Sequence, residues 1–358
     1  MNVLFVTANY YLPQMRGGLQ ASTNELCRHL MESGHKVSVL CSLMPQQAVG
    51  KAARLKIKAR KMLGLAPVAC DHVVGYKVWR AWHPWEVAGH VIAKDKPDVI
   101  IVLAFKPVLM ALAVKPYGIP TIIQLQDVEF SQHGGAFEEL GIMPSVANSR
   151  FTAGTYAKAY GLDPVVIMPF INGALYQTET VRQNVTFINP NQKKGVGIAI
   201  ELARRCPDIP FTFIESWPLL PEDRKTLDQA LAELQNLTFL PPQGDMRTVY
   251  GKARVLLAPS LWNEGYGRVA TEAQFSGIPV LASNRGGLPE AVGDGGVVLD
   301  PQAPIEDWVA ALRRLWDDEA YYQEMSRKAA AYALREEMTL QHHWDVWEQV
   351  LTAAVTRS

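Results

Sequence analysis

Short apolar runs and longer amphipathic stretches alternate along the whole chain. The short runs are rich in valine, isoleucine and leucine, which is typical of buried strands, and the longer stretches repeat apolar positions at helical spacing. This alternation predicts parallel sheets covered by helices. The strands predicted for the first half are 2–7, 36–40, 74–80, 98–103, 121–125 and 165–168. Those predicted for the second half are 185–188, 211–215, 237–240, 255–258, 280–283 and 297–299.

Several helices are bounded by recognisable signals. Residues 19–33 form an amphipathic stretch that ends at Gly34, and either Asn148 or Ser149 can cap a helix running to about residue 160. The apolar stretch 99–114 is too short to span a bilayer and predicts a buried strand followed by a helix. The tail, from about residue 303, is predicted to be helical.

The segment 169–184 is polar and irregular, and we predict that it links two domains. The expected fold class is therefore α/β, with two Rossmann-like, doubly wound domains facing each other across a cleft at the C-terminal ends of their strands. The predicted boundaries are 1–170 for the N-terminal domain and 171–335 for the C-terminal domain. Residues 336–358 are predicted to form a C-terminal helix that packs back on the N-terminal domain.

Composition narrows the function classes. The 358 residues exceed one ordinary core, which fits two domains. Lysine plus arginine and aspartate plus glutamate number 35 each, so no global field attracts nucleic acid, and no nucleic-acid partner is expected. The four cysteines, Cys27, Cys41, Cys70 and Cys206, lie far apart and predict reduced thiols in a cytoplasmic protein. The first residues predict a strand and not a signal peptide.

The most informative stretch joins the strand 255–258 to a helical pattern. Glu264 precedes the turn Gly265-Tyr266-Gly267, and Glu272 follows on the helix. The first-turn N–H groups of a helix have no partner within it, so they can hold an anion. Carboxylates nearby can bind sugar hydroxyls. A ligand carrying both phosphate and hydroxyls, such as a nucleotide sugar, fits this pattern, whereas two ordinary surface glutamates are the alternative interpretation.

Two further loops carry candidate ligand residues. Gly17 and Gly18 precede the first helix, where a glycine pair lets the backbone approach a phosphate or sugar; an ordinary loop needing positive φ explains them equally well. The loop lacks the GxGxxG spacing, so a nicotinamide cofactor is poorly supported. Lys193 and Lys194 precede a helix at Gly195 and could neutralise a diphosphate, although solvated lysines are the commoner case.

The motifs together resemble the family 4 retaining glycosyltransferases. The resemblance rests on Glu264 and Glu272 with seven residues between them (the EX7E motif), and on Gly277-Ile-Pro279, Gly286-Gly287 and Pro289-Glu290. It extends to Gly17-Gly18, to Lys194-Gly195 and to Asp245-Met246, and so covers most of the chain. The family implies a GT-B fold, with an acceptor-side N-terminal domain and a C-terminal domain that binds the nucleotide sugar.

The resemblance also implies residue roles. Glu264 would face the donor sugar, Glu272 would bind the ribose, and Lys194 would contact the diphosphate. Gly17 and Gly18 would lie against the diphosphate from the other domain. The remaining donor-binding positions implied by the family are Met246, Tyr266, Gly267, Arg268 and Val269. The donor is a substrate, and the resemblance implies neither a metal nor another cofactor, in keeping with a sequence that lacks a DxD signature.

Two positions depart from the family pattern. Asn189 stands where the family usually has an arginine, five residues before the diphosphate lysine, and it supplies no charge. Gln126 stands where a histidine often faces the donor sugar, with Asp127 beside it; we count both among the catalytic candidates with Glu264 and Lys194. His133 lies near in sequence, but a lone loop histidine more often belongs to a polar surface.

The acceptor side offers one clue. The segment 51–63 is basic and partly amphipathic, and it could lie on an anionic membrane as a peripheral contact or hold an anionic, lipid-linked or sugar acceptor. A solvated helix or a flexible loop is the alternative. The leading hypothesis is a retaining, front-face, metal-independent transfer of a hexose-type sugar from a nucleoside diphosphate. A nucleotide-sugar epimerase and an inactive sugar-binding protein on the same fold remain the alternatives.

Overall fold

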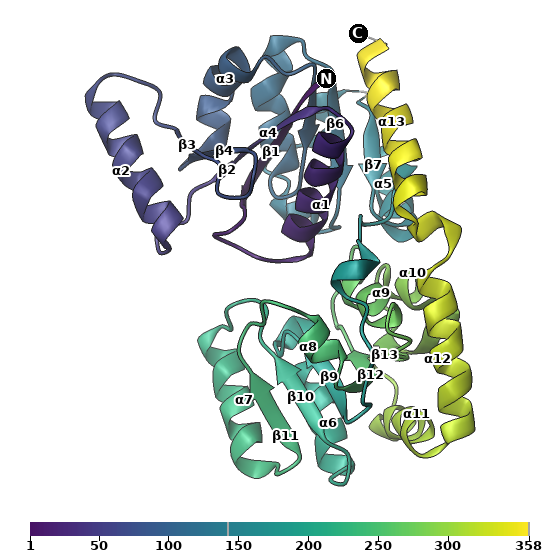
Figure 1. Ribbon diagram of the computed structural model, residues 1–358. Coiled ribbons are helices and arrows are strands. Elements are labelled where there is room, and N and C mark those ends of the chain that lie inside the picture. Colours follow the sequence, from purple (N-terminus) through teal and green to yellow (C-terminus); the bar gives the residue numbers. More distant parts are fainter. Residues whose placement is uncertain (142, 357–358) are drawn as a thin grey trace. The chain divides into compact units, whose positions relative to one another are not determined.

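The computed structural model describes residues 1–141 and 143–356, and its contacts divide the chain into two compact units (Figure 1). Unit 1 comprises Met1–Phe170 and His343–Ser358, and unit 2 comprises Ile171–His342. Each unit holds its own sheet with helices on both faces, so the predicted α/β class is confirmed. Within the described chain, no helix has the length and apolar character needed to cross a bilayer.

Unit 1 is built on an eight-stranded sheet of order β3-β4-β2-β1-β5-β6-β7-β8. All neighbours are parallel except β3, which runs antiparallel to β4. The strands are β1 (Asn2–Tyr10), β2 (Lys36–Ser42), β3 (Ala69–Asp71), β4 (Lys77–Ala81), β5 (Val99–Val102), β6 (Thr121–Leu125), β7 (Ser145–Ala147) and β8 (Val165–Val166). The helices are α1 (Gly18–Glu32), α2 (Ala48–Met62), α3 (Pro84–Asp95), α4 (Pro107–Val114), α5 (Arg150–Tyr160) and α13 (Leu340–Thr356).

The central strand β1 shows why this sheet is buried on both faces. Its side chains alternate, so that Leu4 and Val6 enter one apolar cluster and Val3 and Phe5 enter the other. The second cluster also contains Trp347 of α13, which is 2% exposed. The C-terminal helix therefore covers a face of the unit 1 sheet, as the sequence analysis expected.

Unit 2 is built on a six-stranded, all-parallel sheet of order β11-β10-β9-β12-β13-β14. Its strands are β9 (Asn184–Ile188), β10 (Phe211–Ile214), β11 (Leu237–Leu240), β12 (Ala253–Ala258), β13 (Val280–Ser283) and β14 (Gly296–Leu299). Its helices are α6 (Val196–Arg205), α7 (Pro221–Glu233), α8 (Arg247–Tyr250), α9 (Arg268–Gln274), α10 (Leu288–Val292), α11 (Ile305–Asp317) and α12 (Glu319–Ala333). Short 3₁₀ turns occur in both units. Those of unit 1 are η1 (Lys115–Tyr117), η2 (Phe130–Gln132) and η3 (Phe137–Leu140). Those of unit 2 are η4 (Gly173–Leu175), η5 (Gln192–Lys194), η6 (Gly293–Gly295) and η7 (Glu336–Met338).

Some predicted elements needed correction. The strand predicted at 74–80 is β4 and begins only at Lys77, because Gly75 has φ +95° and closes a turn by donating its N–H to the carbonyl of His72. The short strands β3 and β7 were not predicted, since runs of three residues carry too little periodicity. The capping prediction is confirmed, with the Ser149 hydroxyl accepting from the Thr152 N–H.

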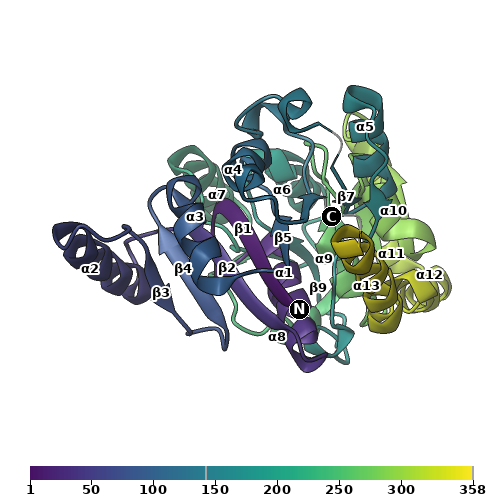
Figure 2. The same ribbon diagram turned by 90° about the horizontal axis from the view of Figure 1, so that it is seen from above.

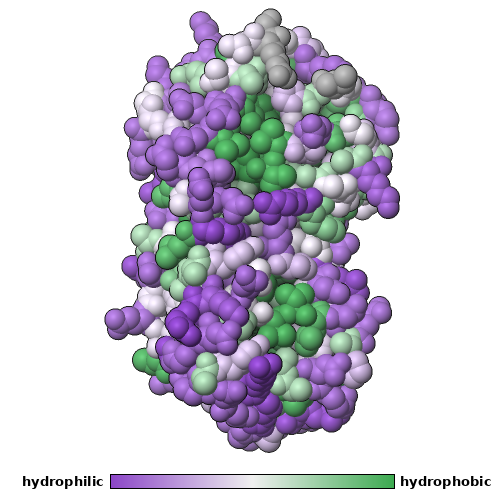
Figure 3. Space-filling view, turned by 90° about the vertical axis from the view of Figure 1, so that its right-hand side faces the viewer, coloured by the Kyte–Doolittle hydropathy of each residue, from purple (hydrophilic) through white to green (hydrophobic). Residues whose placement is uncertain are grey.

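The face drawn in Figure 3 is mostly hydrophilic. Figure 3 faces the side that carries α11, α12 and α13 and shows hydrophobic residues gathered in a patch on each unit. At another edge of unit 1, Figures 1 and 2 both show α2 beside β3 at the end of the sheet. The helix α2 excludes the flexible loop that was one alternative for 51–63, and the solvated helix stays an alternative.

Strand order locates the candidate sites. In unit 2 the chain leaves β9 towards β10 on one side, while β12 lies on the other, so the order reverses between β9 and β12. In unit 1 the same reversal lies between β1 and β5. Open α/β sheets bind ligands at the carboxyl ends of the strands at such a reversal. The loops after β9, β12 and β1 carry most of the predicted site residues.

Candidate functional site

In unit 2 the loops after β9 and β12 are locked against each other. Gly195 has φ +81°, and a Cβ placed there would lie 2.0 Å from the carbonyl oxygen of Pro259. The N–H of Leu261 donates to the carbonyl of Lys193 over 2.9 Å. Only glycine satisfies both the backbone angle and the close approach at position 195. This packing brings Lys194 and Glu264, which are far apart in sequence, to one place.

Lys194 and Glu264 form an ion pair at the centre of this site. The Lys194 Nζ lies 2.5 Å from Glu264 Oε1, and the Ser260 hydroxyl donates to the same oxygen. The two side chains are 16% and 13% exposed, so the pair is shielded but reachable. Burial disfavours the carboxylate, yet the Lys194 charge and the hydrogen bonds from Lys194 and Ser260 outweigh it and lower the pKa of Glu264. Glu264 is therefore an ionised acceptor at neutral pH.

Two tryptophans flank the Lys194 ammonium. Its Nζ lies 5.1 Å from the ring centroids of both Trp217 and Trp262, within cation–π range. Sequence reasoning missed both residues, although Trp262 stands two positions before Glu264 within the motif stretch. The rings restrict where the ammonium can point, which helps to hold a positive charge in the site without an extended salt-bridge network.

Asn189 holds the loop after β10, which carries Trp217. It has φ +62°, a conformation that asparagine tolerates better than most residues, and it is 6% exposed. Its Oδ1 accepts the N–H groups of Ser216 (3.0 Å) and Trp217 (2.8 Å). The Asn189 side chain, which the sequence analysis gave as a donor-binding candidate, thus fixes the loop after β10 and places Trp217 beside Lys194.

The backbone of Glu264 is fixed by the glycine pair of the later motif. Gly286 has φ +62°, and a Cβ there would lie 2.1 Å from the Glu264 carbonyl oxygen. The N–H of Gly287 donates to that oxygen over 2.7 Å. Glu264 and Gly286 also form an isolated parallel bridge. The Gly286-Gly287 motif therefore positions the carboxylate through close backbone packing.

Helix α9 begins at Arg268, after Gly267 with φ +100°. A Cβ at Gly267 would lie 2.6 Å from Leu288 Cδ2, so the turn also needs glycine for space. Along the helix, the Arg268 Nε donates to Glu272 Oε1 over 2.7 Å. The Tyr250 hydroxyl donates to Glu272 Oε2 over 2.9 Å.

The surroundings of Glu272 affect its predicted role. Burial and the charge of Glu272 raise the pKa of Tyr250 well above its ordinary value, so Tyr250 keeps its proton and remains a donor. Glu272 is 7% exposed and already bonded on both oxygens, so a ribose would have to share or replace one of these contacts. Met246 and Val269 are half-buried, and the Tyr266 ring is buried with its hydroxyl beside Thr271.

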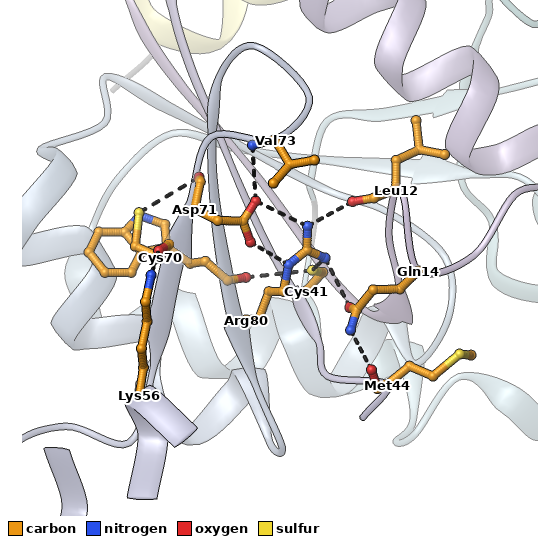
Figure 4. Close-up of polar contacts among 10 residues, drawn as sticks. Leu12, Gln14, Cys41, Met44, Lys56, Cys70, Asp71, Val73 and Arg80 are labelled. Carbon is orange, nitrogen blue, oxygen red and sulfur yellow. Dashed lines mark hydrogen bonds and ion pairs between the residues drawn. The ribbon is translucent and has the colours of Figure 1, made fainter. Parts of the chain in front are cut away.

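In unit 1 the loop that leads to Gly17 and Gly18 is tied to a buried arginine, as Figure 4 shows. Arg80 of β4 is 0% exposed and pairs with Asp71 of β3, with Nε 2.6 Å from Oδ2. Its Nη1 donates to Gln14 Oε1 over 2.9 Å, and its Nη2 donates to the Leu12 carbonyl over 2.7 Å. Weaker contacts reach Cys41 Sγ and Asp71 Oδ1. The guanidinium, with five N–H donors, is thus fully engaged.

The loop is fixed further by its own side chains. Gln14 Nε2 donates to the Met44 carbonyl over 2.5 Å, and Gln47 Nε2 donates to the Gln14 carbonyl over 3.0 Å. Gly17 has φ −176°, which any residue adopts, so the explanation of this glycine by a positive φ is wrong. The absence of a side chain, rather than backbone strain, distinguishes that position.

After β6, Gln126 and Asp127 differ in environment from the residues of unit 2. Burial raises the pKa of Asp127 to about 6, and the nearby Glu129 charge adds to the shift against a hydrogen bond from the Glu129 backbone. The Oε1 of Gln126 is buried and has no hydrogen-bond partner among the described residues. Buried polar atoms normally have partners, and strongly shifted pKa values are frequent at functional sites. Both observations are therefore typical of ligand-binding side chains.

The expectation for His133 was wrong. It is 1% exposed, its Nε2 lies 2.7 Å from the Tyr156 hydroxyl, and it packs among the rings of Phe130, Phe137 and Tyr156. Burial lowers the pKa of His133 to about 4, so the ring is neutral at pH 7. The four cysteines are free, and three of them are buried, in keeping with the sequence analysis.

Two family models match the chain, one in each unit. Residues 17–157 match the Glycosyl transferase 4-like domain, and residues 189–332 match the Glycosyl transferases group 1 family. The chain belongs to the family 4 glycosyltransferases. The matched segments contain Gly17 and Gly18 in the first and Lys194, Glu264 and Glu272 in the second.

Curated relatives of this glycosyltransferase share its sequence locally. The D-inositol 3-phosphate glycosyltransferase of Corynebacterium diphtheriae is 42% identical over 111 residues, which is 30% of this chain and 26% of that protein. The enzyme of the same name from Mycobacterium sp. (strain JLS) is 33% identical over 186 residues, 49% of this chain and 38% of that protein. The matches thus span well under half the length of these relatives.

Solved structures share the fold of the glycosyltransferase over nearly its whole length. Anabaena HepE, solved in complex with UDP-glucose, has a TM-score of 0.77 at 18% identity and covers 98% of this chain and 100% of its own. The sucrose-phosphate synthase of Thermosynechococcus elongatus has a TM-score of 0.75 at 14% identity, with 100% of both chains covered. These likenesses establish the GT-B fold.

Proposed function

We propose that the glycosyltransferase moves a hexose-type sugar from a nucleoside diphosphate to an acceptor hydroxyl with retention of anomeric configuration. The observation that supports this most directly is the Lys194–Glu264 pair at the β9/β12 reversal of unit 2. It places an ammonium and a carboxylate side by side, as a donor with a diphosphate and a polyhydroxylated ring requires. The neighbouring fold of HepE, which was solved with UDP-glucose, supports the same donor class.

Each residue of the proposed site contacts a different part of the donor. Lys194 has three N–H donors, so it can keep its bond to Glu264 and still donate to the diphosphate. Glu264 accepts hydroxyls of the donor sugar, and Glu272 serves the ribose. The backbone at 267–269 and the Gly17-Gly18 loop approach the phosphates without side-chain obstruction.

The chemical step needs no enzymic nucleophile in this proposal. The bond between C1 of the sugar and the phosphate oxygen breaks, and a bond to the acceptor oxygen forms on the same face. The acceptor proton passes to the departing phosphate oxygen. Lys194 stabilises the charge that develops on the diphosphate, and a bound metal ion has this role in metal-dependent enzymes. Gln126 and Asp127 are proposed to face the donor sugar from unit 1.

Nucleoside diphosphate release tests the proposal. The protein is incubated with a panel of nucleotide sugars, with and without acceptor extracts, and in the presence of EDTA. Wild type should release the diphosphate despite EDTA, and proton NMR should show retained configuration. Lys194→Met and Glu264→Gln should each lower turnover by about a hundredfold or more, as loss of a charge-stabilising group does. Lys328→Gln, which breaks an exposed ion pair with Glu324, is the matched control and should leave turnover unchanged.

Other outcomes would contradict the proposal in distinct ways. Binding without release, even with acceptor extracts, would indicate an inactive sugar-binding protein, a reading that the uncharged Asn189 position favours. A product sugar inverted at C2 and no transfer would indicate an epimerase. Loss of activity in EDTA that a divalent cation restores would refute metal independence.

We propose further that the acceptor is a sugar or a lipid-linked group and that residues 51–63 contact an anionic membrane surface peripherally, from the cytoplasmic side. Leu55 and Met62 of α2 and Leu63, which follows the helix, are 69%, 80% and 74% exposed. The helix bears lysines and arginines but no acidic residue, which suits anionic phospholipid. Co-sedimentation with phosphatidylglycerol vesicles should fall in Leu55→Ser/Met62→Ser and be absent with phosphatidylcholine. Equal sedimentation of the variant would refute the contact.

A further inference from the structure

A groove of about 420 Å³ in unit 1 lies between α2 and the segment that joins β4 to α3. Arg54, Lys58 and Lys61 of α2 line one side, and Trp82 and His83 line the other. Figures 1 and 2 show α2 standing at the edge of the sheet, next to β3. The groove is therefore formed by the face of α2 that turns towards the sheet, beside the buried Ile57, and not by its exposed apolar stripe.

The groove carries three cationic side chains from α2 and one acidic side chain, Glu86. Arg54, Lys58 and Lys61 follow one another at helical spacing on one face, and none forms an ion pair with a residue that the structure describes. Like charges three or four residues apart on a helix repel each other and destabilise it. Glu86 is an acidic side chain in the lining, so the cations remain in excess. An anion would relieve this repulsion.

The opposite wall adds a second source of positive potential. The helix α3 has twelve residues, starts at Pro84 with His83 as its N-cap, and has Glu86 in its first turn. Since Trp82, His83 and Glu86 all line the groove, this N-terminus opens on it. The helix dipole attracts an anion to such a position, although Pro84 has no N–H and the Glu86 N–H donates to the His83 carbonyl over 3.1 Å. Cations from one helix and the positive end of another thus converge on the same space.

The remaining lining suits the organic part of a ligand. Trp82 is 44% exposed, and the buried side chains of Ile57 and Val87 lie at the floor. An exposed indole offers a flat apolar face on which a sugar or polyol ring can stack. A site with three cations, a helix N-terminus and an exposed ring is therefore adapted to a phosphate attached to a ring, more than to a free inorganic ion.

The groove also lies where an acceptor would be expected. Ala81, the last residue of β4, lines it, so it opens at the carboxyl end of the sheet. The preceding residue, Arg80, holds the Leu12–Gln14 loop on the way to Gly17. The groove and the glycine loop are thus attached to consecutive residues of one strand.

We propose that this groove binds the phosphate of a phosphorylated acceptor, with Arg54, Lys58 and Lys61 as phosphate ligands. The proposal rests on the transfer reaction proposed above, because it assigns the acceptor class. The phosphate could belong to a soluble phosphorylated polyol or to a lipid headgroup. The chemistry of recognition is the same in both cases, and the experiment separates the two sources.

Calorimetric titration of the full chain tests the soluble source, with D-inositol 3-phosphate, inositol and inorganic phosphate as probes. The variant Arg54→Gln/Lys61→Gln removes two groove cations. Lys51→Gln/Lys56→Gln removes two cations of the same helix that do not line the groove and is the matched control. Binding of inositol phosphate should weaken at least about tenfold in the groove variant, since a charge-assisted hydrogen bond contributes about 1.5–3 kcal/mol. The control should change by less than about threefold.

A vesicle arm tests the lipid source, comparing phosphatidylcholine vesicles with and without phosphatidylinositol. A groove-dependent difference only with vesicles would assign the phosphate to a headgroup, and one only with inositol phosphate would assign it to a soluble acceptor. Failure of both probes to bind, or equal losses in the two variants, would overturn the proposal. Tight binding of inorganic phosphate alone would overturn the role of Trp82.

Donor hydrolysis without acceptor separates failure of this proposal from failure of the reaction. If wild type hydrolyses the donor but both variants bind phosphates equally, only the groove assignment fails. If wild type neither hydrolyses nor transfers, the proposed reaction itself fails.

Discussion

Arg80→Met is the most demanding test of how unit 1 is organised. The substitution keeps an apolar stem of similar length in a site where Arg80 is 0% exposed, but it removes every donor of the guanidinium. Asp71, 16% exposed, then loses its partner, and the Gln14 Oε1 and the Leu12 carbonyl lose theirs. Breaking one side of a buried ion pair costs about 3–5 kcal/mol, mainly because a charge is left behind without compensation.

We expect Arg80→Met to lower the free energy of unfolding of unit 1 by about 3–5 kcal/mol. Arg80→Lys should recover only part of this stability, because an ammonium cannot contact Asp71, Gln14 and Leu12 at once as the planar guanidinium does. The double variant Arg80→Met/Asp71→Leu should be more stable than Arg80→Met alone, since it removes the stranded carboxylate.

Urea unfolding measures the loss of stability. Hydrogen exchange of the peptide covering residues 2–18 measures how far the loop after β1 loosens. Faster exchange in the loop than in unit 2 would show that the damage is local. The apparent affinity for a nucleoside diphosphate should fall with it, whereas Arg224→Met, which breaks an exposed pair with Asp228, should change neither quantity. A loss below about 1 kcal/mol in Arg80→Met, or a double variant no better than the single one, would refute the reasoning.

Three further predictions concern single positions. Gly286→Ala should cost about 1–3 kcal/mol and reduce turnover, because φ is +62° and the new Cβ would lie 2.1 Å from the Glu264 carbonyl; Gly244→Ala, which meets open space, should be neutral in the same unfolding assay. His133→Phe should flatten the acid side of the stability profile: the folded pKa of about 4 lies below the ordinary 6.5, so the wild-type contribution is complete above pH 6.5 and about 3 kcal/mol is lost as pH falls through 4. An unchanged slope between about pH 7 and pH 4 would contradict it. Asp127→Asn should remove an ionisation near pH 6 from the pH profile of donor turnover, and a profile that keeps this limb would assign it elsewhere.

The sequence was sufficient for the parallel strands because their apolar runs are long and bounded by turns, as at 185–188. It was insufficient where a short segment pairs through tertiary context, as β3 does with β4. The resemblance implied that Glu264 and Lys194 both contact the donor, but their direct ion pair was not predicted, since nothing in local pattern joins residues 70 positions apart. Their flanking tryptophans and the capture of Asn189 by the loop after β10 depend on three-dimensional packing, which hydrophobic periodicity does not encode.

The same limit explains the wrong expectation for His133 and the omission of Arg80. His133 was expected at a polar surface because histidine in a loop usually lies there, but the Phe130, Phe137 and Tyr156 rings come from three separate segments to enclose it. Arg80 drew no attention in sequence because a single arginine inside a strand has no motif around it. Its acceptors lie at positions 12, 14, 41 and 71, and only the folded sheet brings them together.

The position of α13 has a consequence for the order of synthesis. Trp347 and Leu351 complete the apolar cluster that also contains Val3 and Phe5 of the first strand. During translation, that face of the first sheet stays open while the whole of 171–342 emerges and can fold by itself, because unit 2 is contiguous. Strand β1 is thus synthesised well before α13, the helix that covers its face. In this molecule the interval between those two events is the period in which exposed strands such as β1 are most vulnerable to aggregation.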